Sequence, residues 1–218
     1  MIGSLSHSVI RECSNPDCKF RFPDTNSQQP QIPCPICNSP TNLVNTIDLS
    51  QDNRRNNFWK IPQSFIAVID NVRSVYNVGA IFRTAIGFGL SKIYLCGITP
   101  TPSHKNFSKV SLGAEKYMLW ERSLNCVDLI IALKNAGSKI VSVETSKNAT
   151  SILDANKDNF IWKDFALVVG NEISGIDPKI ISMSDLVFSI PINGENKSFN
   201  VTTAFGIALY HLASIVSA

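Results

Sequence analysis

The sequence predicts an α/β fold in which helices cover both faces of a parallel β-sheet. Two observations lead to this prediction. From about residue 64 onward, apolar runs of strand length alternate with segments of helical pattern, and the runs are apolar almost throughout. Strands that are buried on both faces have this continuous apolar character, and strands that alternate with helices are typical of a parallel sheet.

Five segments have the character of buried strands: residues 65–70, 92–97, 139–145, 165–170 and 186–191. The first, FIAVID, and the fourth, FALVVG, each begin with five consecutive apolar residues. Helical patterns of apolar residues occupy positions 78–88, 124–136 and 201–216. We therefore assign residues 64–218 to one domain.

The first part of the chain has a different composition. Residues 1–45 are rich in Cys, Pro, Asn and Gln and have little periodicity, which predicts a small accessory domain. Residues 46–63 are polar and are predicted to be a linker, in which Phe58, Trp59 and Ile61 are candidates for docking on the following domain.

Composition and charge exclude several classes of protein. The chain has 218 residues, of which 44% are hydrophobic and 17% charged, as expected for a soluble globular protein. It has no apolar run near the ~20 residues that span a bilayer and no secretory signal pattern, so we expect a cytoplasmic protein with reduced cysteines. The net charge of +3 permits binding to nucleic acid but does not by itself predict it.

Four cysteines in the N-terminal segment have metal-ligand spacing. Cys13, Cys18, Cys34 and Cys37 form C-x4-C and C-x2-C pairs that are separated by fifteen residues. Two close pairs joined by a loop can supply the four thiolates of a tetrahedral zinc site, so the segment is predicted to be a zinc ribbon. The alternatives are four unrelated buried cysteines or two disulfides, and a reducing compartment disfavours the disulfides. The remaining Cys96 and Cys126 are predicted to be small buried residues.

The role of the ribbon is left open by its sequence. Residues 11–40 contain three basic and three acidic residues, so the segment has no electrostatic signature of a nucleic-acid clamp. Phe20 and Phe22 could stack on bases or could form the ribbon's own small core.

Polar residues follow the predicted strands, at the edge of the sheet where parallel α/β folds bind ligands. The candidates are Asn77, Gly79 and Arg83 after the first strand, Thr145 at the end of the third, Gly170, Asn171, Glu172 and Gly175 after the fourth, and Ser198 and Asn200 after the last. Any one of them could be only a helix cap or a turn residue. Three such loops at one edge of a sheet instead favour a site for a polar ligand.

Several common sites are absent from the sequence. No G-x-G-x-x-G or G-x-x-x-x-G-K-[ST] pattern occurs, and the three histidines (His7, His104 and His211) do not suggest a catalytic triad. The candidate residues are amides, hydroxyls, one arginine and one carboxylate. Such a set suits the positioning of a polar ligand and a phosphate better than it suits hydrolysis.

Three ordered motifs in this domain resemble those of a known family. The segments NVGAIFRTA, LVVGNEISGI and IPINGENKSFNVTTAFGIAL are similar to the three motifs of the SpoU/TrmH family of RNA ribose 2′-O-methyltransferases. KVSLGAEKYMLWE also resembles a segment of that family, and the likeness runs from about residue 65 to the C-terminus. Phe199 stands where the family more often has leucine. The cysteine segment lies outside the resemblance.

The resemblance implies a SPOUT fold with a C-terminal trefoil knot, a homodimer packed through the knot region, and S-adenosylmethionine as cofactor. By motif position, Gly170, Ile190 and Phe199 would contact the cofactor, and Thr145, Asn171 and Val201 would lie close by. The polar cluster at residues 193–200 would then be the knot loop. Transfer RNA or ribosomal RNA is the implied substrate.

The resemblance also implies a mechanism. A ribose 2′-hydroxyl is a very weak acid, so methyl transfer to it requires alignment and activation. Arg83, assisted by an RNA phosphate, would orient and activate the hydroxyl, although a guanidinium group is a poor proton acceptor. Asn77, Glu172, Ser198 and Asn200 would hold Arg83 and the ribose in place. The reaction requires no metal, so the predicted zinc would be structural.

Three other functions compete with this hypothesis. One is a catalytically silent RNA-binding adaptor of the same fold, which would not need to keep the whole set of polar residues. Another is a methyltransferase that acts on a base nitrogen, against which the arginine of the first motif argues. The third is a plain nucleotide-binding α/β domain, which the missing phosphate loop disfavours.

Overall fold

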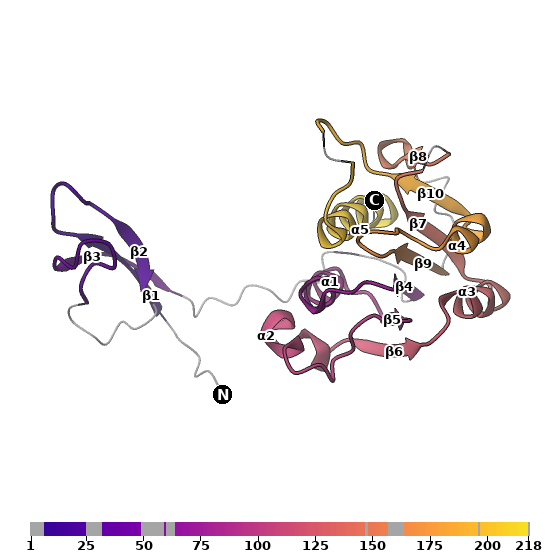
Figure 1. The fold of residues 1–218 in the computed structure, drawn as a ribbon, viewed down its shortest axis with the longest axis horizontal. Coiled ribbons are helices and arrows are strands. Elements are labelled where there is room, and N and C mark those ends of the chain that lie inside the picture. Colours follow the sequence, from indigo (N-terminus) through magenta and orange to yellow (C-terminus); the bar gives the residue numbers. More distant parts are fainter. Residues whose placement is uncertain are drawn as a thin grey trace. The chain divides into compact units, whose positions relative to one another are not determined.

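The computed structural model describes residues 7–24, 32–48, 59, 64–146, 148–156, 164–195 and 197–217. The chain divides into two compact units, Met1–Asn57 and Phe58–Ala218. We describe each unit by itself (Figure 1).

The first unit contains a three-stranded antiparallel sheet in the order β2-β1-β3. Its strands are β1 (His7–Cys13), β2 (Arg21–Asp24) and β3 (Thr41–Asp48). β3 continues into the range expected for the linker, because its pairing with β1 extends to the partners His7 and Asp48. Residues 49–58 and 60–63 of the expected linker lie outside the described residues.

Two contacts stabilise this small sheet. The Phe20 and Phe22 rings stack on each other with centroids 5.5 Å apart. The Arg11 side chain is only 2% exposed, and its Nε lies 2.9 Å from the Asp24 carboxylate. A buried guanidinium requires such a partner, because an unpaired buried charge is strongly destabilising.

The second unit contains a seven-stranded sheet in the order β6-β5-β4-β9-β7-β10-β8, and all of its pairings are parallel. The strands are β4 (Ser64–Asp70), β5 (Lys92–Cys96), β6 (Leu119–Ser123), β7 (Lys139–Val143), β8 (Thr150–Ser151), β9 (Asp164–Val169) and β10 (Leu186–Ser189). All five predicted strands are present, with ends shifted by one or two residues. β6 and β8 were not predicted, because β6 is a mostly exposed edge strand with charged residues and β8 has only two residues.

Helices cover both faces of this sheet, which confirms the predicted α/β class. The helices are α1 (Val75–Phe88), α2 (Phe107–Ser111), α3 (Cys126–Asn135), α4 (Pro178–Met183) and α5 (Val201–Ser217), with short 3₁₀ helices η1 (Ala114–Lys116) and η2 (Ile152–Asp154). α1, α2 and α5 lie on one face, and α3 and α4 lie on the other (Figure 1). The short α2 and α4 were not predicted. None of the helices in the described residues has the length and apolar character needed to cross a bilayer.

Each face of the sheet has its own core. The first includes Phe65 and Phe165, whose rings on the neighbouring strands β4 and β9 lie 4.0 Å apart. The second includes the predicted buried residues Cys96 and Cys126. The two side chains lie within hydrogen-bonding distance of each other, and this hydrogen bond together with burial raises the pKa of Cys126.

The boundaries of α1 follow from its caps. Ser74 precedes the helix, and its side chain accepts a hydrogen bond from the Asn77 amide, so the helix begins three residues before the predicted start. Gly89 ends it with a left-handed conformation (φ 79°). Near this end, the Trp59 ring packs on Phe88 and Tyr210 at centroid distances of 5.0 and 5.5 Å. The docking expected for Trp59 is therefore present.

Candidate functional site

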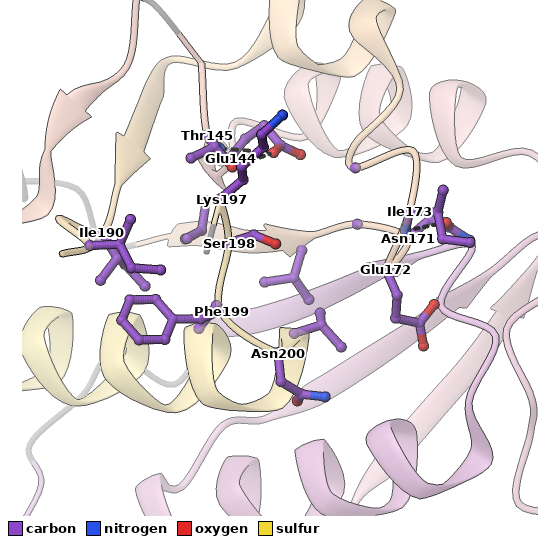
Figure 2. A pocket seen from close by; sticks show the side chains of 17 residues that line it. Glu144, Thr145, Asn171, Glu172, Ile173, Ile190, Lys197, Ser198, Phe199 and Asn200 are labelled. Atoms are coloured by element: carbon purple, nitrogen blue, oxygen red, sulfur yellow. Dashed lines mark hydrogen bonds between the residues drawn. The ribbon is translucent and has the colours of Figure 1, made fainter. Parts of the chain in front are cut away.

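A pocket of about 740 Å³ lies at the carboxyl ends of β7, β9 and β10. It is formed by three loops and the first turns of α5. Its lining includes the three residues predicted to contact the cofactor (Gly170, Ile190 and Phe199) and the three predicted to lie close by (Thr145, Asn171 and Val201). Three of the five predicted catalytic residues, Glu172, Ser198 and Asn200, also line it. Ile190 lies beside Phe199 on one side of the pocket, and Glu172 lies on the opposite side (Figure 2). The predicted site residues thus largely converge on one cavity.

Position 170 requires a glycine because the backbone of residues 175 and 176 passes directly beside it. A Cβ atom at this position would overlap the backbone of Gly175 and Ile176. The approach is fixed by a two-hydrogen-bond bridge, in which the amides and carbonyls of Asn171 and Gly175 pair at 3.0 Å. Gly170 therefore shapes the pocket by letting the loop fold back on itself.

The Asn171 side chain holds this loop in place. Its Oδ1 accepts hydrogen bonds from the amides of Ile173 (2.9 Å) and Ser174 (3.1 Å). Its Nδ2 donates to the carbonyl of Asn71, in the loop after β4, at 2.7 Å. The side-chain amide of Asn171 is thus hydrogen-bonded within the protein. It contributes to the pocket by holding the loop in position.

Glu172 joins this loop to the N-terminus of α1. Its carboxylate accepts hydrogen bonds from the backbone amides of Arg73 (3.0 Å) and Ser74 (3.1 Å) and from the Asn77 side chain (2.9 Å). Burial raises the pKa of Glu172, but the hydrogen bonds from Arg73, Asn77 and Ser74 outweigh it and hold the pKa below its usual value. Glu172 is therefore an ionised group that caps a helix supplied by a distant part of the chain.

Asn77 connects Glu172 to the loop before α5. Its Oδ1 accepts a hydrogen bond from Asn200 Nδ2 at 3.2 Å, while its own Nδ2 donates to Glu172. Asn200 also caps α5, because its Oδ1 accepts from the Thr202 amide at 2.9 Å. Residues from all three sequence motifs are hence linked in one hydrogen-bonded chain, although Asn77 itself does not line the pocket.

Arg83 lies apart from this network. It is exposed on α1 and lines a separate depression with Ala80 and Thr84. Six positions along an α-helix correspond to a rotation of about 240°, so Arg83 and Asn77 point in different directions. The structure brings together Asn77, Glu172 and Asn200 but does not bring Arg83 into the same pocket.

Two charged residues of the pocket were missed by the sequence analysis. Glu144 follows β7, and its carboxylate accepts hydrogen bonds from the amides of Thr145 and Ile176, both at 2.8 Å. It therefore ties two of the pocket loops together. Lys197, in the loop before α5, also lines the pocket. Glu144 was hidden within a predicted strand, and its position just before Thr145 at the strand's carboxyl end was the available signal.

The four cysteines of the first unit come together as the spacing predicts. Their Sγ atoms all lie within 4.8 Å of one another. The Sγ atoms of Cys13 and Cys37 lie 3.3 Å apart, and those of Cys18 and Cys34 lie 3.8 Å apart. A tetrahedral site with Zn–S bonds of about 2.3 Å has sulfur–sulfur edges near 3.8 Å. The Ile36 amide lies 3.5 Å from the Cys34 sulfur, as donors around metal-bound thiolates do. The donor set fits one zinc ion.

Comparisons with known proteins identify the second unit. Residues 64–210 match the model of the SpoU rRNA Methylase family. The tRNA (guanosine(18)-2′-O)-methyltransferase of Aquifex aeolicus is 31% identical over 151 residues, which are 69% of each protein. The crystal structure of the A. aeolicus TrmH/SpoU tRNA modifying enzyme has a TM-score of 0.64 at 30% identity, covering 74% of this chain and 79% of that one.

A further solved structure carries a ligand. The AdoMet-bound rRNA methyltransferase from Sinorhizobium meliloti has a TM-score of 0.63 at 26% identity, covering 69% of this chain and 56% of that one. A parallel α/β domain with its pocket at the carboxyl edge of the sheet defines a ligand-binding domain. The family match makes the class specific: this chain belongs to the SpoU rRNA methylase family.

Proposed function

We propose that this chain is an S-adenosylmethionine-dependent methyltransferase that modifies a ribose 2′-hydroxyl of tRNA or rRNA. The observation that carries the proposal is the hydrogen-bonded chain from Glu172 through Asn77 to Asn200 at the edge of the pocket. A protein that only bound RNA would have no need for this arrangement beside a cavity. Family membership and the named activities of the relatives support it.

The pocket fits the cofactor in size and chemistry. Pockets for small ligands have volumes of about 300–1,000 Å³ and combine apolar walls with a few polar groups. Here the walls include Ile190, Phe199 and Val143, and loop backbone borders the cavity at Gly170. We propose that these residues and Thr145, Asn171 and Val201 hold S-adenosylmethionine, which supplies a methyl group on a sulfonium centre. We further propose that the loops around the pocket form the trefoil knot implied by the family.

Residues beside the pocket would then position the ribose 2′-hydroxyl that accepts the methyl group. Ser198 and Asn200 border the pocket and can hydrogen-bond to a ribose. Asn77 holds the side-chain amide of Asn200 in place through a hydrogen bond, and Glu172 holds Asn77 in the same way. As the ribose oxygen bonds to the methyl carbon, the bond from that carbon to the cofactor's sulfur would break and S-adenosylhomocysteine would leave. The hydroxyl proton would pass to a phosphate oxygen of the RNA or to water. Arg83 would orient the hydroxyl through the RNA phosphate and stabilise the developing negative charge.

The position of Arg83 supports a homodimer. Because Arg83 does not line the pocket of its own chain, we propose that it reaches the pocket of a second copy. On α5, Ile207 is 37% exposed and would offer an apolar side chain to such an interface. A twofold-symmetric dimer would build two equivalent sites, each from both copies.

We propose the following organisation for the rest of the chain. Residues 1–45 form a ribbon that binds one structural zinc through Cys13, Cys18, Cys34 and Cys37, residues 46–63 link it to the methyltransferase domain at 64–218, and the protein acts in the cytoplasm. The four clustered sulfurs and the division into two compact units support this organisation.

The decisive test is methyl transfer. Purified protein is incubated with methyl-labelled S-adenosylmethionine and with bulk tRNA or rRNA from cells that lack the protein. Nucleosides from the digested product are then separated. Label in a 2′-O-methylnucleoside is the expected result. Label in a base-methylated nucleoside, or cofactor binding without transfer to any RNA, would contradict the proposal.

A further inference from the structure

A basic and aromatic surface lies beside the pocket, on α1 and the segment that contains α2 and η1. We call it the α1–α2 surface and define it by six exposed side chains: Arg73, Tyr76, Lys105, Lys109, Lys116 and Tyr117. The two tyrosines are 64% and 83% exposed. Large aromatic side chains with this exposure are available for contact with a partner.

These residues belong to one continuous surface because α1 and α2 pack closely. A Cβ on Gly79 would come within 2.8 Å of the Val110 side chain, so the helices are in contact there. Phe82 and Phe107 lie beneath the contact with ring centroids 5.0 Å apart. Tyr76 is three positions before Gly79, so it lies near the side of α1 that packs on α2. Tyr117 and Lys116 follow directly through η1.

The charge of this region is distinct from that of the rest of the domain. Residues 73–117 contain six Lys or Arg residues, of which Lys92 on β5 pairs with Glu121, and a single acidic residue, Glu115. Glu115 accepts a hydrogen bond from Ser111. Residues 164–218 have the opposite balance, with five acidic and two basic residues. The region is therefore locally cationic although the whole chain carries only +3.

The α1–α2 surface is continuous with the pocket. The backbone amide of Arg73 donates to Glu172, and Glu172 lines the pocket. An RNA strand that leaves the pocket past Glu172 would therefore meet Arg73.

We infer that the α1–α2 surface binds a single-stranded segment of the substrate RNA that flanks the methylated nucleotide. This inference rests on the proposed function. The lysines and Arg73 match the phosphate backbone, and exposed tyrosine rings provide platforms for unpaired bases. Stacking requires bases that are free of a duplex, which selects single strands over helices.

The test uses single variants with a matched control. Lys109→Glu, Lys116→Glu and Tyr117→Ala are compared with Lys179→Glu, an exposed lysine on α4 at the opposite face of the sheet. Binding of a 20-nucleotide single-stranded RNA and of a duplex of equal length is measured over a range of salt concentrations. Calorimetry with S-adenosylhomocysteine checks that the pocket is intact in every variant.

Each lysine variant should weaken single-strand binding and reduce the slope of log affinity against log salt by about one. Tyr117→Ala should weaken it about tenfold while the slope is kept. Lys179→Glu should have little effect. Wild-type affinity and slope in all three variants, or equal losses for duplex and single strand, would overturn the inference. A changed molecular mass in place of a changed RNA affinity would assign the surface to a second copy of the chain. Failure of the wild type to methylate any RNA would refute the proposed function instead.

Discussion

The side-chain amide of Asn77 donates a 2.9 Å hydrogen bond to the carboxylate of Glu172, which lies 95 positions further along the chain. Asn77 Oδ1 also accepts a hydrogen bond from the Asn200 side chain. One asparagine outside the pocket therefore links two loops that line it. The geometry of the site depends on this residue as much as on those that would touch ligand.

Asn77→Ala should lower the rate of methyl transfer more than it weakens cofactor binding. The substitution removes two hydrogen bonds that hold Glu172 and Asn200, so we expect a loss in turnover of about tenfold, or about 1.4 kcal/mol. Steady-state kinetics and calorimetry with S-adenosylhomocysteine would separate the two effects. Asn135→Ala, at the exposed end of α3, is the control. Equal losses in turnover and cofactor affinity would contradict the positioning role.

Gly170→Ala should destabilise the domain and weaken cofactor binding. The new methyl group would overlap the backbone of Gly175 and Ile176, so the loop must shift at a cost of about 1–3 kcal/mol. Gly87→Ala is a matched control, because nothing lies within 4 Å of a Cβ there and alanine favours a helix. Urea unfolding should show opposite changes in the free energy of unfolding for the two variants. An unchanged Gly170→Ala protein would refute the close approach.

Glu172 should make stability depend on pH. Its pKa in the folded protein lies below the usual value, so folding favours the ionised form. The stabilisation is therefore fully present above the unfolded pKa of about 4.3 and is lost as the pH falls through the folded pKa. The free energies of unfolding of the wild type and Glu172→Gln should differ most near neutral pH and converge in acid. A difference that is constant with pH would show that ionisation is not involved.

The ribbon should carry about one zinc per chain. Cys34→Ser should release the metal and unfold the ribbon, whereas the affinity for S-adenosylhomocysteine should stay close to that of the wild type. Cys96→Ser is the comparison, because Cys96 belongs to the core of the other unit and should leave the zinc content unchanged. Metal analysis of protein prepared without chelators provides the measurement. Metal-free, folded wild-type protein would exclude the zinc site.

Arg83 should act across a dimer interface. Arg83→Ala alone should lose at least a hundredfold in turnover, or about 2.7 kcal/mol, and keep its cofactor affinity. The variant is then refolded as a mixture with Thr145→Trp, whose ring should fill the cofactor pocket from an exposed position, so that half of the dimers are heterodimers with one intact site. Activity of about a quarter of the wild type is then expected. No recovery in the mixture, or a monomer mass by light scattering, would show that Arg83 does not act on the pocket of a partner.

The sequence predicted most of the sheet because buried parallel strands such as Phe65–Ile69 and Phe165–Val169 are unbroken apolar runs. Edge strand β6 was not predicted because most of its residues are exposed and some are charged, so it has no continuous apolar run. The three motif loops were predicted to meet because parallel strands end at one edge. The hydrogen bond that joins Glu144 to the Ile176 amide, and the separation of Arg83 from the pocket, depend on how distant segments pack together, which the sequence pattern does not give.

The hydrogen bond between Asn200 and Asn77 spans 123 positions, which has a consequence for the order of folding during synthesis. Within the second unit, β4, α1 and β5 leave the ribosome first, but the partners that complete the pocket are made last. A nascent chain therefore cannot hold the cofactor until α5 has emerged. Contacts between residues so distant in sequence also form slowly. Cofactor binding should therefore appear only in the last stage of folding and not at the initial collapse of the chain.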